Sequence, residues 1–284
     1  MESPNQPATL PRPWRLVLFT LACAAGVLGL RIVLPLVSGV LATVTGYPFA
    51  THAYVWTLTG GMLIGHVWTL RLVEPRGWSY VGLGRDALRA RAIAAGLLLG
   101  ALGIGLPSLA LLAMHWLRVD PAPPGNSLTD ALQTLAILAP AALGEELMLR
   151  GYFFAVLREA WGAGRALVVT SVLFGLLHLQ NAGANAQSVA LVALAGIFLG
   201  AVLVTTGSLY AAWAAHLSWN FVQASLLHSA VSGIGLAAPN YRVVDAGPDW
   251  ATGGAWGPEG GVFAGIGMAV ALFFLYRRRE RRAE

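Results

Sequence analysis

Two adjacent carboxylates stand inside a long apolar stretch of this chain. Of its 13 Asp and Glu residues, Glu145 and Glu146 are the two that fall in the interior of such a stretch. On a helix, side chains four positions apart share a face, so Glu146 can pair with Arg150 one turn later. Glu145 points elsewhere and has no cation nearby in the sequence. Because ionisable groups at membrane depth are costly and usually functional, Glu145 is the first candidate for chemistry.

Two further pairs of residues with a spacing of four occur in later apolar stretches. Phe174 precedes His178, and His216 precedes Asn220. At about 1.5 Å per helical residue, the polar members of these pairs and Glu145 all fall within roughly two helical turns of one plane near the middle of a bilayer. Scattered packing residues have no reason to agree in depth. The spacing therefore predicts that one carboxylate, two imidazoles and one amide form a single site.

Such a set of groups can hydrolyse a peptide bond. A carboxylate can take a proton from water with the help of an imidazole, and Asn220 with a histidine can donate hydrogen bonds to the oxyanion of a tetrahedral intermediate. The same groups can alternatively hold a metal ion, since two histidines and a carboxylate make a catalytic zinc set with an open position for water. The residues alone leave both mechanisms open, one with Zn²⁺ or another divalent metal and one without metal.

Other hydrolase signatures are absent from the sequence. It contains no His-Glu-x-x-His zinc motif and no Gly-x-Ser-x-Gly nucleophile elbow. No Asp lies in the interior of an expected membrane span, which disfavours an intramembrane aspartate pair.

The composition indicates that the surroundings of this chain are largely lipid. It is 57% hydrophobic and 11% charged, whereas soluble domains carry about 25% charged residues. The net charge of +5 does not point to nucleic acid, because the basic residues flank apolar runs instead of forming one patch. We expect a lipid bilayer as a partner and no nucleic acid.

The apolar runs predict an all-α, polytopic membrane helix bundle with about eight transmembrane helices of roughly 20 residues each. The expected spans are 16–40, 52–72, 92–117, 131–157, 165–180, 187–206, 208–230 and 261–276. The segment from Glu74 to Ala90 reads either as an interfacial amphipathic segment or as a plain cytoplasmic loop. The segment 231–260, rich in Gly, Pro and Asp, is expected to be irregular and exposed on the far side.

The placement of arginine predicts the orientation, because cytoplasmic loops carry the positive excess. Eight spans put both termini in the cytoplasm of a multi-pass plasma membrane protein, and the opposite loops are then neutral or acidic. The compact architecture favours a bacterial inner membrane. The arginines on the expected cytoplasmic side are Arg12, Arg15, Arg71, Arg76, Arg85, Arg89, Arg91, Arg158, Arg165, Arg277, Arg278, Arg279, Arg281 and Arg282.

The spans divide the chain into three parts. Residues 1–130 hold the first three spans and a cytoplasmic loop, and residues 131–230 hold the expected catalytic core of spans four to seven. Residues 231–284 hold an extracytoplasmic loop, the last span and a basic cytoplasmic tail.

Three motifs in this order resemble those of the CPBP family, the CAAX prenyl endopeptidases and bacteriocin-processing proteins also called the Abi family. The family pattern is Glu-Glu-x-x-x-Arg, Phe-x-x-x-His and His-x-x-x-Asn, and it covers about residues 140–225 here. Each motif alone is weak, but three in order on separate spans are specific. They stand as Glu145, Glu146 and Arg150, then Phe174 and His178, then His216 and Asn220.

The resemblance implies a membrane-embedded endopeptidase that acts on a membrane protein or peptide. It makes Glu145 the water-activating base with His178 assisting, and Glu146 and Arg150 supporting or ligand residues. It makes His216 and Asn220 oxyanion stabilisers or metal ligands, so the candidate metal ligands are Glu145, His178, His216 and Asn220. Family members cleave prenylated CAAX tails, process or resist bacteriocins, or trim sorting tags, and a prenylated substrate would be unexpected for a bacterial protein.

Two other functions compete with proteolysis. The carboxylate and histidines could form a proton relay in a transporter, although the spans show no inverted repeat of the kind found in many transporters. A non-catalytic bacteriocin-immunity protein of the same fold is the other alternative, and the intact motifs disfavour it.

Overall fold

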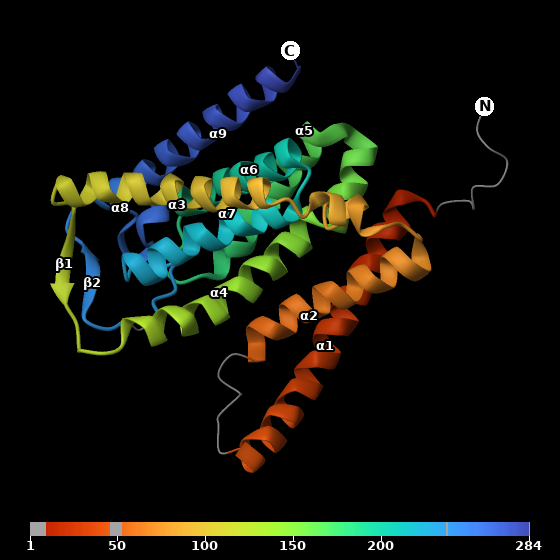
Figure 1. Ribbon diagram of the computed structural model, residues 1–284, viewed down its shortest axis with the longest axis horizontal. Coiled ribbons are helices and arrows are strands. Elements are labelled where there is room, and N and C mark those ends of the chain that lie inside the picture. Colours follow the sequence, from red (N-terminus) through yellow and green to blue (C-terminus); the bar gives the residue numbers. More distant parts are fainter. Residues whose placement is uncertain (1–9, 46–52, 237, 284) are drawn as a thin grey trace.

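The computed structural model describes residues 10–45, 53–236 and 238–283. Long helices dominate these residues and pack side by side, while α1 and α2 cross each other at one side of the bundle (Figure 1). The helices are α1 (Arg12–Thr45), α2 (Ala53–Trp68), α3 (Ala90–Ala113), α4 (Ser127–Arg150), α5 (Tyr152–Leu177), α6 (Ala186–Thr206), α7 (Leu209–Phe221), α8 (Asp249–Thr252) and α9 (Val262–Ala283). The strands are β1 (Leu117–Pro121) and β2 (Tyr241–Asp245).

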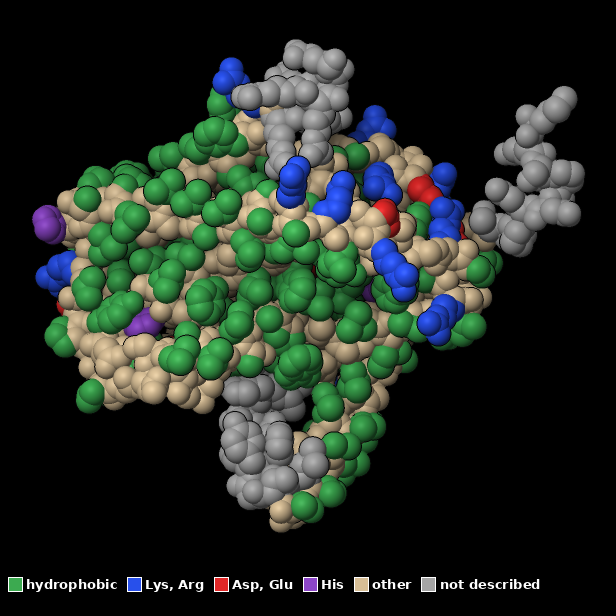
Figure 2. All heavy atoms as spheres, in the orientation of Figure 1, with side chains coloured by type: hydrophobic (Ala, Val, Ile, Leu, Met, Phe, Trp, Pro, Cys, Tyr) green, Lys and Arg blue, Asp and Glu red, His purple; other side chains and the backbone are tan. Residues whose placement is uncertain are grey.

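The described residues form a membrane protein with several candidate spans. By length and composition, four helical stretches are long and apolar enough to cross a membrane: Arg12–Val44, Ala90–Ala113, Ser127–Gln180 and Ala186–Thr206. Hydrophobic side chains cover the broad middle of the surface in Figure 2. Leu98 on α3 and Phe274 on α9 are examples, exposed by 61% and 60%. An apolar surface of this extent fits contact with lipid.

The boundary between the fourth and fifth predicted spans differs from the boundary in the structure. The predicted span 131–157 is wrong, because α4 ends at Arg150 and α5 begins at Tyr152, with Gly151 at φ −78° and ψ −127° between them. The free amide of Tyr152 donates a hydrogen bond to His66 Nε2 at 3.0 Å. The predicted span 165–180 begins just after Gly162, where a kink divides α5 in two, so its start agrees with the structure. The backbone donor that the break leaves without a helical partner bonds to a side chain far away in the sequence, so hydropathy alone could not show the break.

The described part of the chain is mostly helical, as predicted, but it also contains two short strands, and the segment 231–260 is less irregular and less exposed than predicted. Strands β1 and β2 pair antiparallel, with Leu117 opposite Asp245 and Pro121 opposite Tyr241. Within the same segment, Trp256 and Glu259 are buried, with 1% and 8% exposure. The pairing joins residues more than a hundred positions apart, so the local pattern gave no signal of it.

Several contacts position the start of α7, the helix that carries His216 and Asn220. Ser208 caps it, accepting a hydrogen bond from the Ala211 amide at 3.2 Å. The Ser208 hydroxyl also donates to the Ala87 carbonyl at 2.7 Å, and the Leu209 amide donates to the Gly82 carbonyl at 2.9 Å. The segment from Glu74 to Ala90 was predicted to be an interfacial segment or a plain loop. In the structure it is folded and supports the start of α7.

A buried ion-pair network joins α1, the segment after α2 and α5 at the arginine-rich end. Arg15 contacts Glu74 at 2.6 Å and Glu159 at 3.1 Å, and Arg76 contacts Glu74 at 2.7 Å. The Tyr152 hydroxyl donates to Glu74 at 2.6 Å. This network anchors α1 to the first turn of α5, directly after the break that follows Arg150.

Helix α4 is held on two sides just before Glu145. Pro140 lies inside the helix, where it removes one backbone donor. The Trp213 indole of α7 donates to the Ala139 carbonyl at 2.8 Å, and the Thr59 hydroxyl of α2 donates to the Pro140 carbonyl. These contacts fix the part of α4 that directly precedes the adjacent residues Glu145 and Glu146.

Candidate active site

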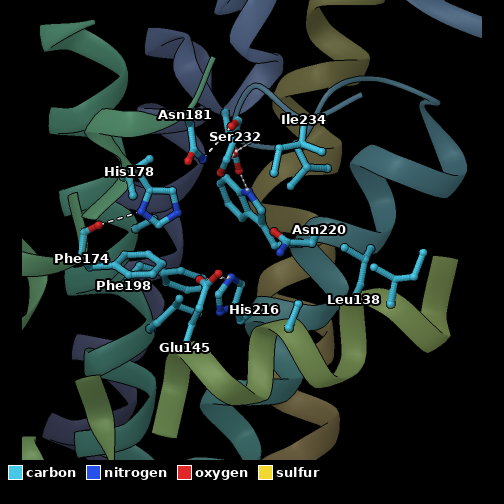
Figure 3. Close-up of a pocket in the computed structure, with 18 of the residues that line it drawn as sticks. Leu138, Glu145, Phe174, His178, Asn181, Phe198, His216, Asn220, Ser232 and Ile234 are labelled. Atoms are coloured by element: carbon cyan, nitrogen blue, oxygen red, sulfur yellow. Dashed lines mark hydrogen bonds and ion pairs between the residues drawn. The ribbon is translucent and has the colours of Figure 1, made fainter. Parts of the chain in front are cut away.

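One cavity of about 140 Å³ collects the predicted site residues (Figure 3). Glu145 comes from α4, His178 from the turn that follows α5, and His216 and Asn220 from α7. The other lining groups are mostly apolar and include Leu138, Phe174, Phe198 and Trp219. The structure thus brings together the four residues that the sequence placed at one depth.

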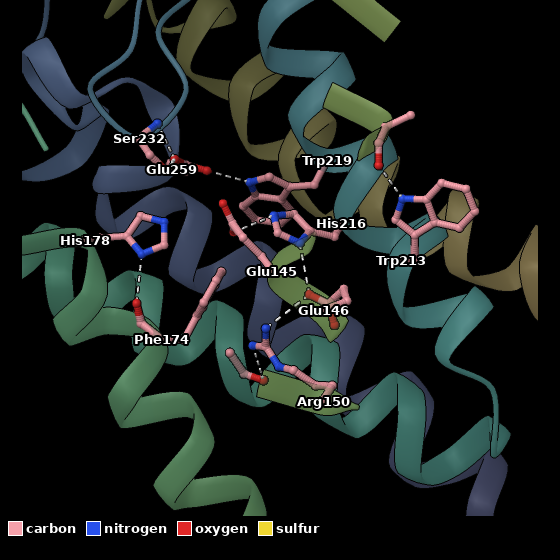
Figure 4. A network of polar contacts seen from close by, with 12 residues as sticks. Glu145, Glu146, Arg150, Phe174, His178, Trp213, His216, Trp219, Ser232 and Glu259 are labelled. Carbon is pink, nitrogen blue, oxygen red and sulfur yellow. Dashed lines mark hydrogen bonds and ion pairs between the residues drawn. The ribbon is translucent and has the colours of Figure 1, made fainter. Parts of the chain in front are cut away.

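Glu145 and His216 lie next to each other in the wall of this cavity. The Glu145 carboxylate oxygen Oε2 lies 3.7 Å from His216 Nε2, and the Glu145 side chain is 29% exposed. Figure 4 shows the Glu145 side chain beside the His216 ring, with the His178 ring across from it. Among the described residues, Glu145 has no arginine partner. Its carboxylate is therefore accessible from the cavity and near an imidazole that can share a proton.

Glu146 holds the opposite nitrogen of the same histidine. Its Oε1 lies 2.9 Å from His216 Nδ1 and 3.1 Å from Arg150 Nη1, and the Glu146 side chain is fully buried. A carboxylate oxygen accepts hydrogen bonds, so Nδ1 of His216 carries a hydrogen and Nε2 faces Glu145. Arg150 is itself held by the Gly196 carbonyl at 3.3 Å and by the Phe174 ring, 4.3 Å from its guanidinium carbon. Glu146 and Arg150 thus lie behind the cavity and support it, as a chain of contacts that ends at His216.

The hydrogen-bond partner of His178 sets its tautomer. His178 Nδ1 lies 2.8 Å from the Phe174 carbonyl oxygen. A carbonyl only accepts, so the hydrogen of the neutral ring is on Nδ1 and Nε2 is an acceptor. The Phe174 ring packs edge-on against this imidazole with centroids 4.8 Å apart. Phe174 therefore orients the His178 ring through its backbone carbonyl and through its aromatic ring, and Nε2 of His178 offers a lone pair to the cavity.

Asn220 presents an unused amide. Its side chain lines the cavity and makes no hydrogen bond with another side chain or backbone group in the described part of the chain. An amide carries two donor hydrogens. Those donors are free for a group that enters the cavity.

The cavity has a further wall that the sequence did not predict. Asn181, Ser232 and Ile234 line it (Figure 3), together with Glu259 (Figure 4). The Asn181 amide donates to the Ser232 carbonyl at 2.9 Å, and the Ser232 amide and hydroxyl each donate to Glu259 Oε1 at 2.6 Å. In the sequence, Glu259 resembles any loop carboxylate between Pro and Gly. The only hint was the nearby Trp256, an aromatic residue in a segment that otherwise looked exposed.

The wall is built on a tight turn from Val231 to Ile234. The two end residues exchange backbone hydrogen bonds of 3.0 and 2.9 Å. The central residues have positive φ, 49° at Ser232 and 77° at Gly233, as in a type I′ turn. A left-handed conformation costs a non-glycine residue about 1–2 kcal/mol, so the hydrogen bonds to Ser232 offset a backbone strain.

The donor set does not fit a metal ion as arranged. Among the described residues, no three His, Cys, Asp or Glu side chains gather closely enough to hold one. Catalytic zinc sites use three protein ligands, and here Glu145 and His216 lie close while His178 stands on the other side of the cavity (Figure 4). The described side chains therefore do not form a three-ligand zinc site as arranged.

Comparison with known proteins agrees with the motifs. Residues 127–222 match a family model described as type II CAAX prenyl endopeptidase Rce1-like. No curated protein and no solved structure matches the chain. The matched segment runs from the start of α4 to the end of α7 and includes each predicted site residue, whereas Ser232 and Glu259 lie beyond it. Over residues 127–222 the chain is therefore similar to the Rce1-like CAAX prenyl endopeptidases, the family also called CPBP or Abi, as the three motifs indicated.

Proposed function

We propose that this protein is an intramembrane endopeptidase that hydrolyses a peptide bond of a membrane-associated protein or peptide. One observation carries the proposal: Glu145, His178, His216 and Asn220 line one cavity, and each keeps a functional atom directed at it. The family of the domain consists of hydrolases of this class. Glu146 and Arg150, by contrast, lie behind the cavity and pair with each other at 3.1 Å.

The proposed reaction starts from a water molecule bound to Glu145. The carboxylate takes one proton while the water oxygen attacks the carbonyl carbon of the substrate, and the lone pair of His178 Nε2 helps to orient the water. The tetrahedral oxyanion accepts hydrogen bonds from the Asn220 amide and from Nε2 of protonated His216. When the carbon–nitrogen bond breaks, protonated Glu145 returns its proton to the leaving amine.

The cavity also suggests the kind of residue that flanks the cleaved bond. Most of its lining is apolar, and Leu138, Phe174, Phe198 and Trp219 are among the larger of these side chains, so we infer that apolar side chains of the substrate enter it. Binding by apolar contact leaves the polar groups free to act on the peptide bond.

Substitution of Glu145 by Gln tests the assignment of the base. The purified full-length protein in phosphatidylcholine vesicles is incubated with a quenched-fluorescent peptide ending in a farnesylated CAAX sequence and with a mixture of unmodified apolar peptides. We expect Glu145→Gln to lower the cleavage rate by at least about 10²-fold, the lower range for loss of a general base, with an unchanged melting temperature. Asp130→Asn on the same helix should cleave like wild type.

Cleavage by Glu145→Gln at the wild-type rate would contradict the assignment. The same assay after dialysis against EDTA, combined with metal analysis of the protein, separates the two mechanisms. We expect cleavage to survive EDTA, because the described donors do not gather around one point.

We further propose that α1–α7 and α9 each cross the membrane, with both termini in the cytoplasm of a bacterial inner membrane. Arginine side chains gather at one end of the molecule in Figure 2, around the link between α2 and α3, and are sparse over β1 and β2. This asymmetry supports the orientation. The side chains of Arg278, Arg279, Arg281 and Arg282 in the predicted basic tail lie outside the described residues.

A further inference from the structure

Glu259 is the most heavily bonded carboxylate in the described part of the chain that belongs to neither the motifs nor the matched domain. Its Oε2 accepts hydrogen bonds of 2.9 Å from the Trp219 indole and of 2.9 Å from the Gln223 amide. Its Oε1 accepts from the amide and the hydroxyl of Ser232, both at 2.6 Å. The side chain is buried, and no ion pair to it exists among the described residues.

These four hydrogen bonds decide what Glu259 can do. An ionised carboxylate has about four lone-pair sites, and four donors already fill them. Glu259 lines the same cavity as Glu145 but has no free site with which to bind or activate water. Its role is therefore to hold other groups in place.

The groups that it holds come from two sides of the cavity. Trp219 stands on α7 between His216 and Asn220, and its ring packs against Phe198 with centroids 6.2 Å apart. Ser232 belongs to the turn from Val231 to Ile234, outside the matched domain. Figure 4 shows Glu259 between the Trp219 indole and Ser232. One carboxylate thus joins the catalytic helix to the turn.

The turn has few other supports in this position. Ser232 is fixed at its amide, its hydroxyl and its carbonyl, the last by Asn181. Gly233 donates to the Trp256 carbonyl at 3.0 Å. Because Ser232 has a positive φ, the turn is strained without its partners and should relax when Glu259 no longer accepts from it.

We propose that Glu259 is a positioning residue that fixes the Val231–Ile234 turn as a substrate-binding wall of the cavity and thereby determines substrate affinity and selectivity. The proposal rests on the proposed endopeptidase function. Ile234 is 54% exposed and Val231 9% exposed, and both line the cavity together with apolar side chains of α6. A substrate side chain that enters beside Val231 and Ile234 is then bound by a segment that takes no part in the proposed reaction.

Glu259→Gln tests the proposal, because it keeps the size of the side chain and replaces one acceptor oxygen with a donor. Asp249→Asn is the matched control, since it removes an exposed carboxylate of the same segment. Both variants are made in the full-length chain. With the peptides used for Glu145, we expect Glu259→Gln to raise KM about tenfold while kcat stays within about threefold, the pattern of lost binding without lost chemistry. The preference among the unmodified peptides should broaden.

Hydrogen exchange read by mass spectrometry gives a second measure that needs no substrate. In Glu259→Gln, exchange in residues 229–236 should accelerate at least about tenfold, while α4 and α6 exchange as in wild type. Asp249→Asn should change neither KM nor this exchange.

The proposal is overturned if exchange in residues 229–236 is unchanged in Glu259→Gln, or if it rises equally in α4 and α6, which would mean a general loss of structure. It is also overturned if KM and selectivity stay at wild-type values while Glu145→Gln is inactive. Cleavage by Glu145→Gln would instead remove the proposed function, and the exchange measurement would still decide whether Glu259 holds the turn.

Discussion

The His216 imidazole lies between two carboxylates that have different surroundings. Glu146 is fully buried, is paired with Arg150 and contacts Nδ1, whereas Glu145 is partly exposed and faces Nε2. Adjacent residues in the sequence therefore have different surroundings, since Glu146 holds the ring from behind and Glu145 is open to the cavity. The helical spacing of about 100° per residue separates them onto two faces of α4.

The buried ion pair between Glu146 and Arg150 leads to a prediction for a single residue. Arg150→Met leaves the Glu146 charge without its cation, and breaking a buried ion pair on one side costs about 3–5 kcal/mol. We expect thermal unfolding in detergent to show a melting temperature lower by several degrees. Arg158→Met, which removes an exposed arginine, should stay within about 0.5 kcal/mol of wild type. Equal melting temperatures for the two variants would contradict a supporting role for Arg150.

The residues of the site were predictable to different degrees for physical reasons. The pairing of Glu146 with Arg150 follows from a spacing of four within one helix, and the structure has it at 3.1 Å. The contact of Glu146 with His216 joins two helices and could not be read from spacing. Glu259 was missed altogether, because its partners Trp219 and Ser232 make it a buried residue only after the chain has folded.

At the scale of elements, α3 and α7 approach closely because glycine lines their contact. A Cβ added at Gly96 would overlap the Ala211 carbonyl oxygen, and one added at Gly100 would overlap the Ala215 carbonyl oxygen. Small residues at this spacing let two helix backbones come together in a membrane. Ala215 directly precedes His216, so the contact with α3 sets the position of an imidazole of the site.

Gly100→Ala should therefore impair activity from outside the cavity. The added methyl group meets a backbone atom that cannot rotate away, so α7 must shift. A displacement of about 1 Å at a catalytic group can lower the rate about 10²-fold, and we expect a loss of that order in the peptide cleavage assay. Gly29→Ala on α1, where nothing lies within 4 Å, is the matched control. A Gly100→Ala protein with wild-type kcat would show that α7 tolerates the change.

The elements were predicted best where a local pattern determined them. The predicted span 187–206 agrees closely with α6, whose ends carry an Asn185 capping box and Gly207 in the left-handed conformation. The break at Gly151 and the pairing of β1 with β2 depend on partners far away in the sequence, His66 in one case and the opposite strand in the other. Apolar periodicity contains no information on such partners.

At the scale of the whole molecule, the arginine-rich end and the end formed by β1 and β2 are opposite one another (Figures 1 and 2). The turn from Val231 to Ile234 and the link between α5 and α6 belong to the second end by connectivity. If arginine marks the cytoplasmic side, this wall of the cavity lies toward the outer side of the membrane. The three-part division of the chain at residues 130 and 230 stays a prediction.

Labelling of single cysteines measures this orientation. In a Cys23→Ala background, which removes the chain's one cysteine, we expect Asp245→Cys to react with a membrane-impermeant maleimide in intact cells. Arg85→Cys should react only after the membrane is permeabilised. Reaction of both positions in intact cells, or of Arg85→Cys alone, would refute the orientation.

The turn held by Glu259 places proposed substrate selection and proposed catalysis in different segments of the chain. The groups proposed to cut the bond all belong to the Rce1-like segment 127–222, while the turn proposed to bind the substrate comes from a different stretch of the same chain. Natural variation in that stretch could redirect the enzyme to new targets without disturbing the reaction. For an engineer, the segment around Ser232 is therefore the place to exchange when the aim is to retarget the protease instead of to repair it.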